Sequence, residues 1–257
     1  MKLFSLQKEF QKLLINKKYY VKYNRSKKIN YKNYYNDPID PDGNSRKLIN
    51  EEKYKLSQLK IINKFLNKKI SKKKNILDFG CGYGWLLKSL NNNKWNKYGI
   101  EINPDALQIA IKNKIKCYKS LLDLKKKNKK KKFDVISLIH VIEHIRNPIQ
   151  LLKKITQMIK KNGYLILETP DFDSAMARKY NTKFRLLHDS THISLFSTES
   201  LSRLINDLNM QIIKVEYPYF EGPYFNKKNI LKLFDNNKNN YSPPFYGSVV
   251  TIFAKKK

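Results

Sequence analysis

The sequence has very little cysteine and no long apolar run. Cys81 and Cys117 are the only two cysteines in 257 residues. They lack C-x-x-C spacing, so a disulfide framework is excluded and a reducing compartment is expected. No run of about 18 apolar residues occurs, and residues 1–18 mix apolar with charged side chains instead of forming a secretory signal. These absences predict a cytoplasmic protein without a membrane span.

Acidic residues and arginine are also scarce. The chain has 21 Asp and Glu against 53 Lys and Arg, which gives a formal net charge of +32. Such a charge ordinarily indicates nucleic acid or acidic lipid as a partner. Only six of the basic residues are arginines, however, and the lysines are scattered with Asn, Ile and Tyr over the whole chain. This pattern favours a solvated surface shaped by coding bias, with nucleic acid as a less favoured partner.

The most informative stretch is residues 75–101. Its apolar start is typical of a strand buried on both faces of a parallel sheet. Gly80, Gly82 and Gly84 follow at once, as expected of a turn that lies directly against a ligand. A short helix and a second strand are predicted next. That strand ends at Glu101, a carboxylate placed to accept hydrogen bonds from the two hydroxyls of a ribose.

The spacing of the glycines decides which nucleoside is expected. A dinucleotide fingerprint needs a third glycine at the position of Trp85, and the Gly-Lys-Ser/Thr of a triphosphate-binding loop is absent. Asp78 instead stands two residues before the first glycine, giving D-x-G-x-G-x-G. This motif resembles the first motif of the class I S-adenosylmethionine-dependent methyltransferases. The resemblance implies that Asp78 and the turn hold the methionine half of the cofactor and that Glu101 holds its ribose. An ordinary glycine turn in another α/β protein is the disfavoured alternative.

A second motif, His140-Val-Ile-Glu143-His144, follows a predicted strand over Phe133–Ile139. H-x-x-E-H also occurs in a group of zinc peptidases, where both histidines lie one turn apart on a long helix. Here the motif follows a strand and is closed by an Asn-Pro pair, so we expect it on a loop at the carboxyl edge of the sheet, beside the glycine turn. A zinc peptidase is therefore disfavoured, and no metal ligand set is predicted.

The stretch FDVISLIHVIEHIRNP, residues 133–148, resembles ubiquinone-type and related small-molecule O-methyltransferases of the methyltransferase domain 23 group. In that group the Glu-His pair lies on the substrate side, sometimes with a divalent metal. The resemblance implies that His140 touches the cofactor and that Glu143 and His144 face the acceptor. It also implies that Asp123, which we expect in a loop, lies near the adenine.

Strand and helix signals alternate through most of the chain. They predict an α/β fold with a doubly wound, mostly parallel seven-stranded sheet and a closing β-hairpin. We divide the chain into an N-terminal helical appendage or lid, residues 1–70, and a methyltransferase domain, residues 71–257. The domain carries insertions at 169–197 and 217–247, and long loops of this kind are usually functional. The second insertion is predicted either to wall an acceptor pocket or to form a minor core.

The sequence also predicts where several helices, a strand and a loop begin and end. The appendage is expected to contain helices over Leu3–Ile15 and Lys47–Leu66. A solvated loop is expected over Lys125–Lys132, and a helix that ends at Lys160–Gly163 is expected to lead into a strand over Tyr164–Glu168. Four tyrosines of the appendage are predicted either to reach the pocket or to serve in packing: Tyr19, Tyr20, Tyr34 and Tyr35.

The implied reaction is O-methylation of a small-molecule or glycan hydroxyl. The [DN]-P-P-[FY] motif of amino-group methyltransferases is absent after the fourth strand, which favours an oxygen acceptor. A hydroxyl needs its proton removed, and we hypothesise that His144 or His192 is the base, oriented by Glu143 or Asp189. The alternative for each histidine is a hydrogen-bonded structural role. The rival function is a basic RNA-binding protein, or an RNA methyltransferase, with an accessory or degenerate cofactor site.

Overall fold

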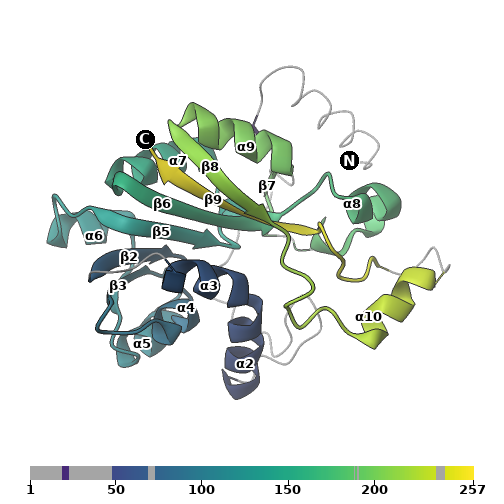
Figure 1. Ribbon diagram of the computed structural model, residues 1–257, viewed down its shortest axis with the longest axis horizontal. Coiled ribbons are helices and arrows are strands. Elements are labelled where there is room, and N and C mark those ends of the chain that lie inside the picture. Colours follow the sequence, from purple (N-terminus) through teal and green to yellow (C-terminus); the bar gives the residue numbers. More distant parts are fainter. Residues whose placement is uncertain (1–18, 23–47, 69–72, 188, 190, 236–240) are drawn as a thin grey trace.

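The computed structural model describes residues 19–22, 48–68, 73–187, 189, 191–235 and 241–257. Their main feature is a seven-stranded sheet in the order β4-β3-β2-β5-β6-β9-β8 (Figure 1). The first five strands in this order run parallel, whereas β9 is antiparallel to both β6 and β8. The predicted mostly parallel sheet with a closing antiparallel pair is therefore confirmed. The strands are β2 (Lys74–Phe79), β3 (Trp95–Ile100), β4 (Lys116–Tyr118), β5 (Phe133–Ile139), β6 (Ile159–Pro170), β8 (Met210–Glu216) and β9 (Val249–Lys256).

Helices cover both faces of the sheet. One buried cluster joins the sheet to α3, α4 and α5, through side chains such as Ile62, Leu87 and Ala106. A second cluster on the other face joins it to α6, α7 and α9, through side chains such as Leu152 and Leu204. This two-sided burial explains why the central strands are apolar throughout. The helices are α2 (Leu48–Gln58), α3 (Lys60–Lys68), α4 (Trp85–Ser89), α5 (Pro104–Lys112), α6 (Leu121–Lys127), α7 (Pro148–Met158), α8 (Ala175–Tyr180), α9 (Thr198–Asp207) and α10 (Lys227–Leu231).

The N-terminal region is described only in part. The helix predicted over Lys47–Leu66 consists of α2 and α3 with a turn at Leu59 between them. The short strand β1 (Val21–Lys22) pairs antiparallel with β7 (Ser194–Leu195). The helix predicted over Leu3–Ile15 lies outside the described residues, as do Tyr34 and Tyr35. No helix among the described residues is long and apolar enough to cross a membrane.

Tyr19 and Tyr20 have packing roles in this structure. The Tyr19 hydroxyl donates a hydrogen bond of 2.5 Å to Asp207. The Tyr20 ring packs on Phe196, with 5.7 Å between ring centroids. Both contacts are to residues of α9 or the segment before it, and neither tyrosine lines the cavity described below. The packing alternative therefore describes these two side chains.

Two predicted boundaries are wrong. Asp123 lies in the first turn of α6, not in a loop, because the Ser120 side chain accepts a hydrogen bond from the Asp123 N–H and caps that helix. The first lysines of the predicted basic loop continue the helix, where cations favour its C-terminal end. The predicted helix does not extend to residues 160–163, because these residues belong to β6. This strand already pairs with β5 at Ile159, and its regular register with β5 resumes at Tyr164 after an irregularity.

Candidate functional site

The glycine turn lies at the carboxyl end of β2 and is fixed to the neighbouring strand. The N–H groups of Gly80 and Cys81 donate to the carbonyl of Ile100, at 2.8 and 3.0 Å. Gly80 has φ +75°, and a Cβ atom at this position would lie 2.5 Å from Cγ2 of Val141. The predicted glycine requirement thus has two causes here, a left-handed backbone and the close approach of the segment after β5.

Glu101 lies at the end of β3 and is buried. Its Oε2 accepts a hydrogen bond of 2.8 Å from the Gly82 N–H, and its Oε1 accepts one of 2.7 Å from the Asn103 N–H. Burial raises the pKa of this carboxyl, and backbone N–H groups, first that of Asn103, partly oppose the rise. Since each carboxylate oxygen has a second lone pair, Glu101 can still accept hydrogen bonds from a ligand.

Asp78 forms a second buried carboxyl beside the turn. Its Oδ1 accepts a hydrogen bond of 2.8 Å from the Ser137 hydroxyl. Burial raises the pKa of Asp78 to about 7, with a further contribution from nearby Glu101, while the Ser137 bond opposes the rise. The two buried carboxyls thus repel each other when both are ionised, and a cationic ligand beside them would favour their ionised forms.

A cavity of about 570 Å³ extends from the glycine turn across the carboxyl edge of the sheet. Its floor contains Asp78, Gly80, Gly82, Glu101 and His140, all predicted as cofactor contacts. Its walls come from α2, from the segment 185–192 and from the insertion 217–247, so that insertion does wall the cavity. Residues from these walls include Tyr54, Gln58, Arg185, His192, Tyr219, Tyr224 and Phe245.

His140 is held between two carboxylates. Its Nδ1 lies 3.3 Å from Glu143 Oε1, and its Nε2 lies 3.4 Å from Glu168 Oε1. Burial opposes the charged imidazolium, but hydrogen bonds to both carboxylates outweigh it and raise the pKa of His140 to about 9. The residue also has φ +52°, which costs a non-glycine residue free energy. His140 is therefore a cation at neutral pH and cannot serve as a base.

Glu143 is fully buried and is not among the residues that line the cavity. Its Oε2 accepts a hydrogen bond of 2.9 Å from the Thr169 hydroxyl. Burial would raise the pKa of Glu143, but the His140 bond and the nearby His144 and His192 lower it to about 2. Glu143 thus remains an anion and gives the histidines around it a fixed negative neighbour.

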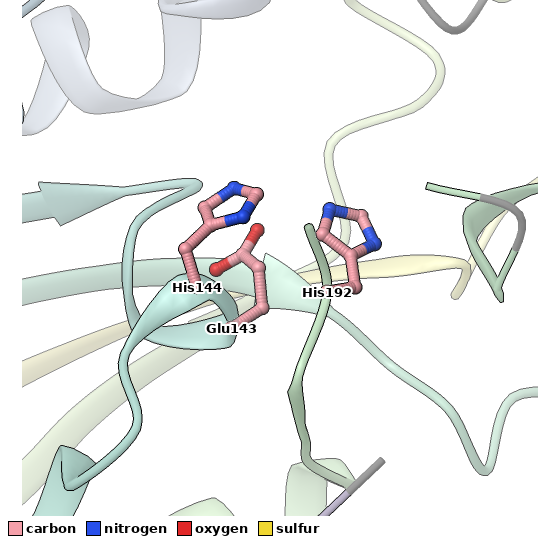
Figure 2. Close-up of side chains that lie close together, drawn as sticks. All are labelled: Glu143, His144 and His192. Carbon is pink, nitrogen blue, oxygen red and sulfur yellow. The ribbon is translucent and has the colours of Figure 1, made fainter. Parts of the chain in front are cut away.

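His144 and His192 come together from two distant segments (Figure 2). His144 belongs to the 3-10 turn Ile142–His144 after β5, and the two ring centroids lie 4.9 Å apart. His144 Nδ1 lies 3.1 Å from the Thr191 carbonyl, and His192 Nδ1 lies 2.6 Å from the Leu186 carbonyl. Because a carbonyl can only accept, both Nδ1 atoms carry the hydrogen. Each neutral ring therefore keeps its lone pair on Nε2.

The surroundings keep His192 neutral. Burial lowers the pKa of His192, and nearby His144 lowers it further, while Asp189 and Glu143 oppose the change. Asp189 Oδ2 lies 3.6 Å from His192 Nε2. Burial alone would raise the pKa of Asp189, but His192 and the Thr191 bonds hold it below its ordinary value. A neutral imidazole can accept a proton, and an anion beside it stabilises the imidazolium that forms.

The same cluster has the composition of a metal site. One ligand atom each from Glu143, His144 and His192 lie within 4.8 Å of one another. One carboxylate oxygen and two imidazole nitrogens are ligands that zinc and related divalent ions accept. The group can thus either take up a proton or hold a cation, and the absence of a metal site stays a prediction from the sequence.

Two of the predicted cofactor residues do not line the cavity. At Gly84 a Cβ atom would lie 2.3 Å from Cδ1 of Ile115, so close packing requires a glycine here, and its contact with the cofactor stays a prediction. Asp123 accepts a weak hydrogen bond of 3.4 Å from the Lys119 N–H at the start of α6. Its contact with the adenine stays a prediction.

Sequence reasoning missed a group of contacts across the top of the cavity. Gln58 Nε2 donates a hydrogen bond of 3.0 Å to the Tyr224 hydroxyl. The rings of Tyr54 and Tyr224 meet edge to face at 5.7 Å, and the Arg185 guanidinium lies 5.2 Å from the centre of the Tyr224 ring. Tyr224 thus joins α2 to both insertions. No local motif signals this, because the partners are up to 166 residues apart in sequence.

Comparison with known proteins identifies the family. A family model described as a methyltransferase domain (Methyltransf_23) matches residues 50–215. The chain belongs to this methyltransferase family. Within the family's class I fold, a crystal structure of an S-adenosylmethionine-dependent methyltransferase from Archaeoglobus fulgidus covers 81% of this chain and 99% of its own, with 20% identity and a TM-score of 0.58. The plantazolicin methyltransferase BpumL, solved with a substrate analogue and S-adenosylhomocysteine, has 19% identity, a TM-score of 0.51 and coverage of 80% and 84%.

Curated relatives are similar over a shorter range. A ubiquinone biosynthesis O-methyltransferase of Pelagibacter ubique is 30% identical over 139 residues, which cover 51% of this chain and 58% of that protein. One of Rickettsia typhi is 31% identical over 101 residues, covering 38% and 41%. The chain thus spans about half the length of the curated relatives it matches.

The site fits S-adenosylmethionine, the cofactor of the family. The volume of about 570 Å³ lies within the usual range for a small-molecule site. Glu101 has acceptor capacity for a ribose, and the two buried carboxyls of Glu101 and Asp78 suit a ligand with sulfonium and ammonium groups. The buried Trp85 Nε1 at the wall of the cavity has no hydrogen-bond partner within the described part of the protein.

Proposed function

We propose that this protein transfers a methyl group from S-adenosylmethionine to a hydroxyl group of a small-molecule or glycan acceptor. The observation that carries the proposal is one cavity lined both by Asp78 and Glu101 and by His144 and His192. When bound, the cofactor supplies a methyl group on a sulfonium, which already has a good leaving group. Asp78 and the glycine turn would hold its methionine half, and Glu101 its ribose.

The histidine pair removes the acceptor proton. A hydroxyl is a poor nucleophile at neutral pH, and a base within hydrogen-bond reach raises its reactivity. Backbone carbonyls fix the tautomer of both rings, so that Nε2 of His144 or His192 is the proton acceptor. Glu143 and Asp189 are anions beside the pair and stabilise the imidazolium that forms. His140 serves instead to neutralise Glu143 and Glu168.

The walls of the cavity align the acceptor and exclude water. Tyr219, Tyr224 and Phe245 contribute rings from the insertion 217–247, and Tyr54 adds one from α2. Orientation and desolvation are the main tasks left to the protein when the leaving group is already good. A cytoplasmic location stays a prediction from the cysteine content.

Calorimetry tests the cofactor half of the proposal. We expect S-adenosylmethionine to bind to the purified full chain with a micromolar dissociation constant, NAD not to bind, and Gly82→Val to abolish binding. A panel of phenols, sugars, amines and a short RNA, with S-adenosylhomocysteine release as readout, then identifies the acceptor class. Turnover with amines alone would overturn the hydroxyl assignment, and turnover with RNA alone would overturn the small-molecule or glycan acceptor. Failure of the cofactor to bind would overturn the enzymatic assignment.

A further inference from the structure

The insertion 217–247 has an outer face that is unusually apolar. Ten large apolar side chains are strongly exposed in the described part of the chain, and six of them lie between residues 220 and 246. Scattered exposed apolar residues are ordinary, whereas a cluster marks an interaction site. We define the outer patch as five of these residues: Phe220, Phe225, Leu231, Phe234 and Tyr246.

The outer patch has two parts, which follow one another in the sequence at Asn226. The ring of Phe220 contacts those of Phe225 and Tyr246, at centroid distances of 5.2 and 5.4 Å. Asn226 then caps α10, which continues into the 3-10 turn Lys232–Phe234. Leu231 and Phe234, three residues apart on this helical stretch, share one side and are 59% and 75% exposed.

The helical stretch is anchored and stands at the margin of the molecule. Leu233 packs against a small buried cluster that includes Phe172 and Phe184, so the opposite side of the stretch must face outward. Figure 1 shows α10 well away from the sheet, at the margin of the molecule. The helical part of the patch thus lies at the edge of the protein.

Exposed lysines flank the patch. Lys227, Lys228 and Lys232 lie on the same helical stretch as Leu231 and Phe234 and are all exposed. An apolar face bordered by lysines is the arrangement with which a helix lies in the interface of a membrane, with the apolar side chains among the acyl chains and the cations at anionic headgroups. We infer that the outer patch docks this protein on a lipid surface that contains anionic lipid.

A second copy of the chain fits the patch less well. In a two-fold symmetric contact the same patch occurs on both partners, so a second copy would bring another Lys227, Lys228 and Lys232 into the same interface. An anionic bilayer instead suits both the apolar side chains and these three lysines, although the exposed Glu221 and Asp235 beside the patch oppose it. The docked segment also carries Pro223 and Tyr224, which line the cavity directly before Phe225, so docking places a wall of the cavity next to the lipid. The inference goes beyond the proposed function and does not depend on it.

Vesicle flotation of the full chain tests the inference. The probes are vesicles of phosphatidylcholine alone and with about one third phosphatidylglycerol, at low salt and at about 0.5 M salt, where the Debye length falls to a few Å. The patch variant is Leu231→Asp with Phe234→Asp. Its matched control is Ile111→Asp with Leu122→Asp, since these side chains on α5 and α6 are 45% and 73% exposed and the change in net charge is identical.

We expect binding to anionic vesicles that partly survives high salt, and a loss of about tenfold or more in the patch variant only. Changing Lys227, Lys228 and Lys232 to Gln should weaken binding to anionic vesicles at low salt and leave the binding at high salt unchanged. Three results would overturn the inference. The first is no flotation, and the second is equal loss in both double variants, which would reflect net charge. The third is a patch variant that lowers the melting temperature or dissociates a dimer, because the patch would then cover part of this chain or a second copy.

Discussion

The two ends of the cavity are built in different ways. At the end proposed for the cofactor, Gly80, Gly82 and Glu101 lie within 22 residues and are held by hydrogen bonds between adjacent parallel strands. At the end proposed for the acceptor, His144 and His192 come from segments 48 residues apart and are fixed by carbonyls of the insertion 169–197. One end is a feature of the sheet itself, and the other is assembled by tertiary contacts.

This difference implies separable roles. The cofactor end depends on the geometry of β2 and β3, which the core of the sheet fixes. The acceptor end depends on loops, which can change without disturbing the sheet. Substitutions at the histidine pair should therefore affect turnover without affecting cofactor binding, and substitutions at the turn should affect cofactor binding first.

The largest expected effect is on turnover. The double change His144→Ala and His192→Ala should lower kcat by about 10²–10⁴-fold, the usual contribution of a general base, while the dissociation constant of S-adenosylmethionine changes by less than about twofold. Single-turnover kinetics and calorimetry measure the two quantities. A loss of about tenfold or less would show that neither histidine is the base, and a parallel loss of cofactor affinity would show that the two ends are not separable.

The sequence predicts that Asp78, the glycine turn and Glu101 lie together, because the information for this arrangement is local. Asp78, the glycines and Glu101 occupy a strand, a turn and a strand end whose spacing fixes their positions on a parallel sheet. The apolar run over Phe133–Ile139 likewise predicts β5 with its observed bounds, because a strand that is buried on both faces of a parallel sheet is apolar along most of its length.

The acceptor end could be predicted only in part. His144 and His192 were recognised as candidates, but the hydrogen bonds that set their tautomers come from Thr191 and Leu186 carbonyls, and backbone carbonyls have no signature in sequence. The contacts of Tyr224 with Gln58 and Arg185 were missed for the same reason. Asp123 lies in α6 instead of the predicted loop because Ser120 caps that helix.

The second effect in size concerns cofactor affinity. Glu101→Ala removes the acceptor of two backbone N–H bonds and of the ribose hydroxyls. Hydrogen bonds to a charged group contribute about 1.5–3 kcal/mol each, so affinity for S-adenosylmethionine should fall by about 10²–10³-fold. Glu199→Ala is the matched control, since this carboxylate on α9 is exposed and pairs only with Arg203 among the described residues. Unchanged affinity in Glu101→Ala, measured by calorimetry, would remove the ribose assignment.

The third effect is on stability, at the junction between the two ends. His140→Asn keeps a residue that tolerates positive φ but leaves the buried carboxylates Glu143 and Glu168 without their cation. We expect a loss of roughly 2–3 kcal/mol in the free energy of unfolding, below the usual cost of a broken buried ion pair because 34% of the His140 side chain is exposed. Adding Glu168→Gln should recover part of the loss.

The pH dependence of this stabilisation has a defined sign. His140 titrates at about 9 in the folded protein against an ordinary value of 6.5, so its contribution is complete below 6.5 and lost as pH rises through about 9. Glu143 titrates at about 2 against 4.5, so its contribution is complete above 4.5 and lost as pH falls toward about 2. The difference between wild type and His140→Asn, from urea unfolding, should be largest between pH 4.5 and 6.5. A difference independent of pH would contradict the ion-pair assignment.

The smallest effect distinguishes the bases at the acceptor end. A base acts only when it is unprotonated, so kcat/KM should fall as pH decreases through the pKa of the base. Burial lowers the pKa of His192 below its ordinary value of 6.5, so the acid limb of the profile should lie below 6.5 if His192 is the base. At pH 6.5 a base with the ordinary histidine pKa would be half protonated, whereas a base with a lower pKa would be mostly unprotonated. The rates expected for these two cases at pH 6.5 therefore differ by less than about twofold. A limb at or above 6.5 would exclude His192 as the base. Both rings donate Nδ1–H to carbonyls in the same way, so the hydrogen-bond geometry alone does not decide whether His192 is the base.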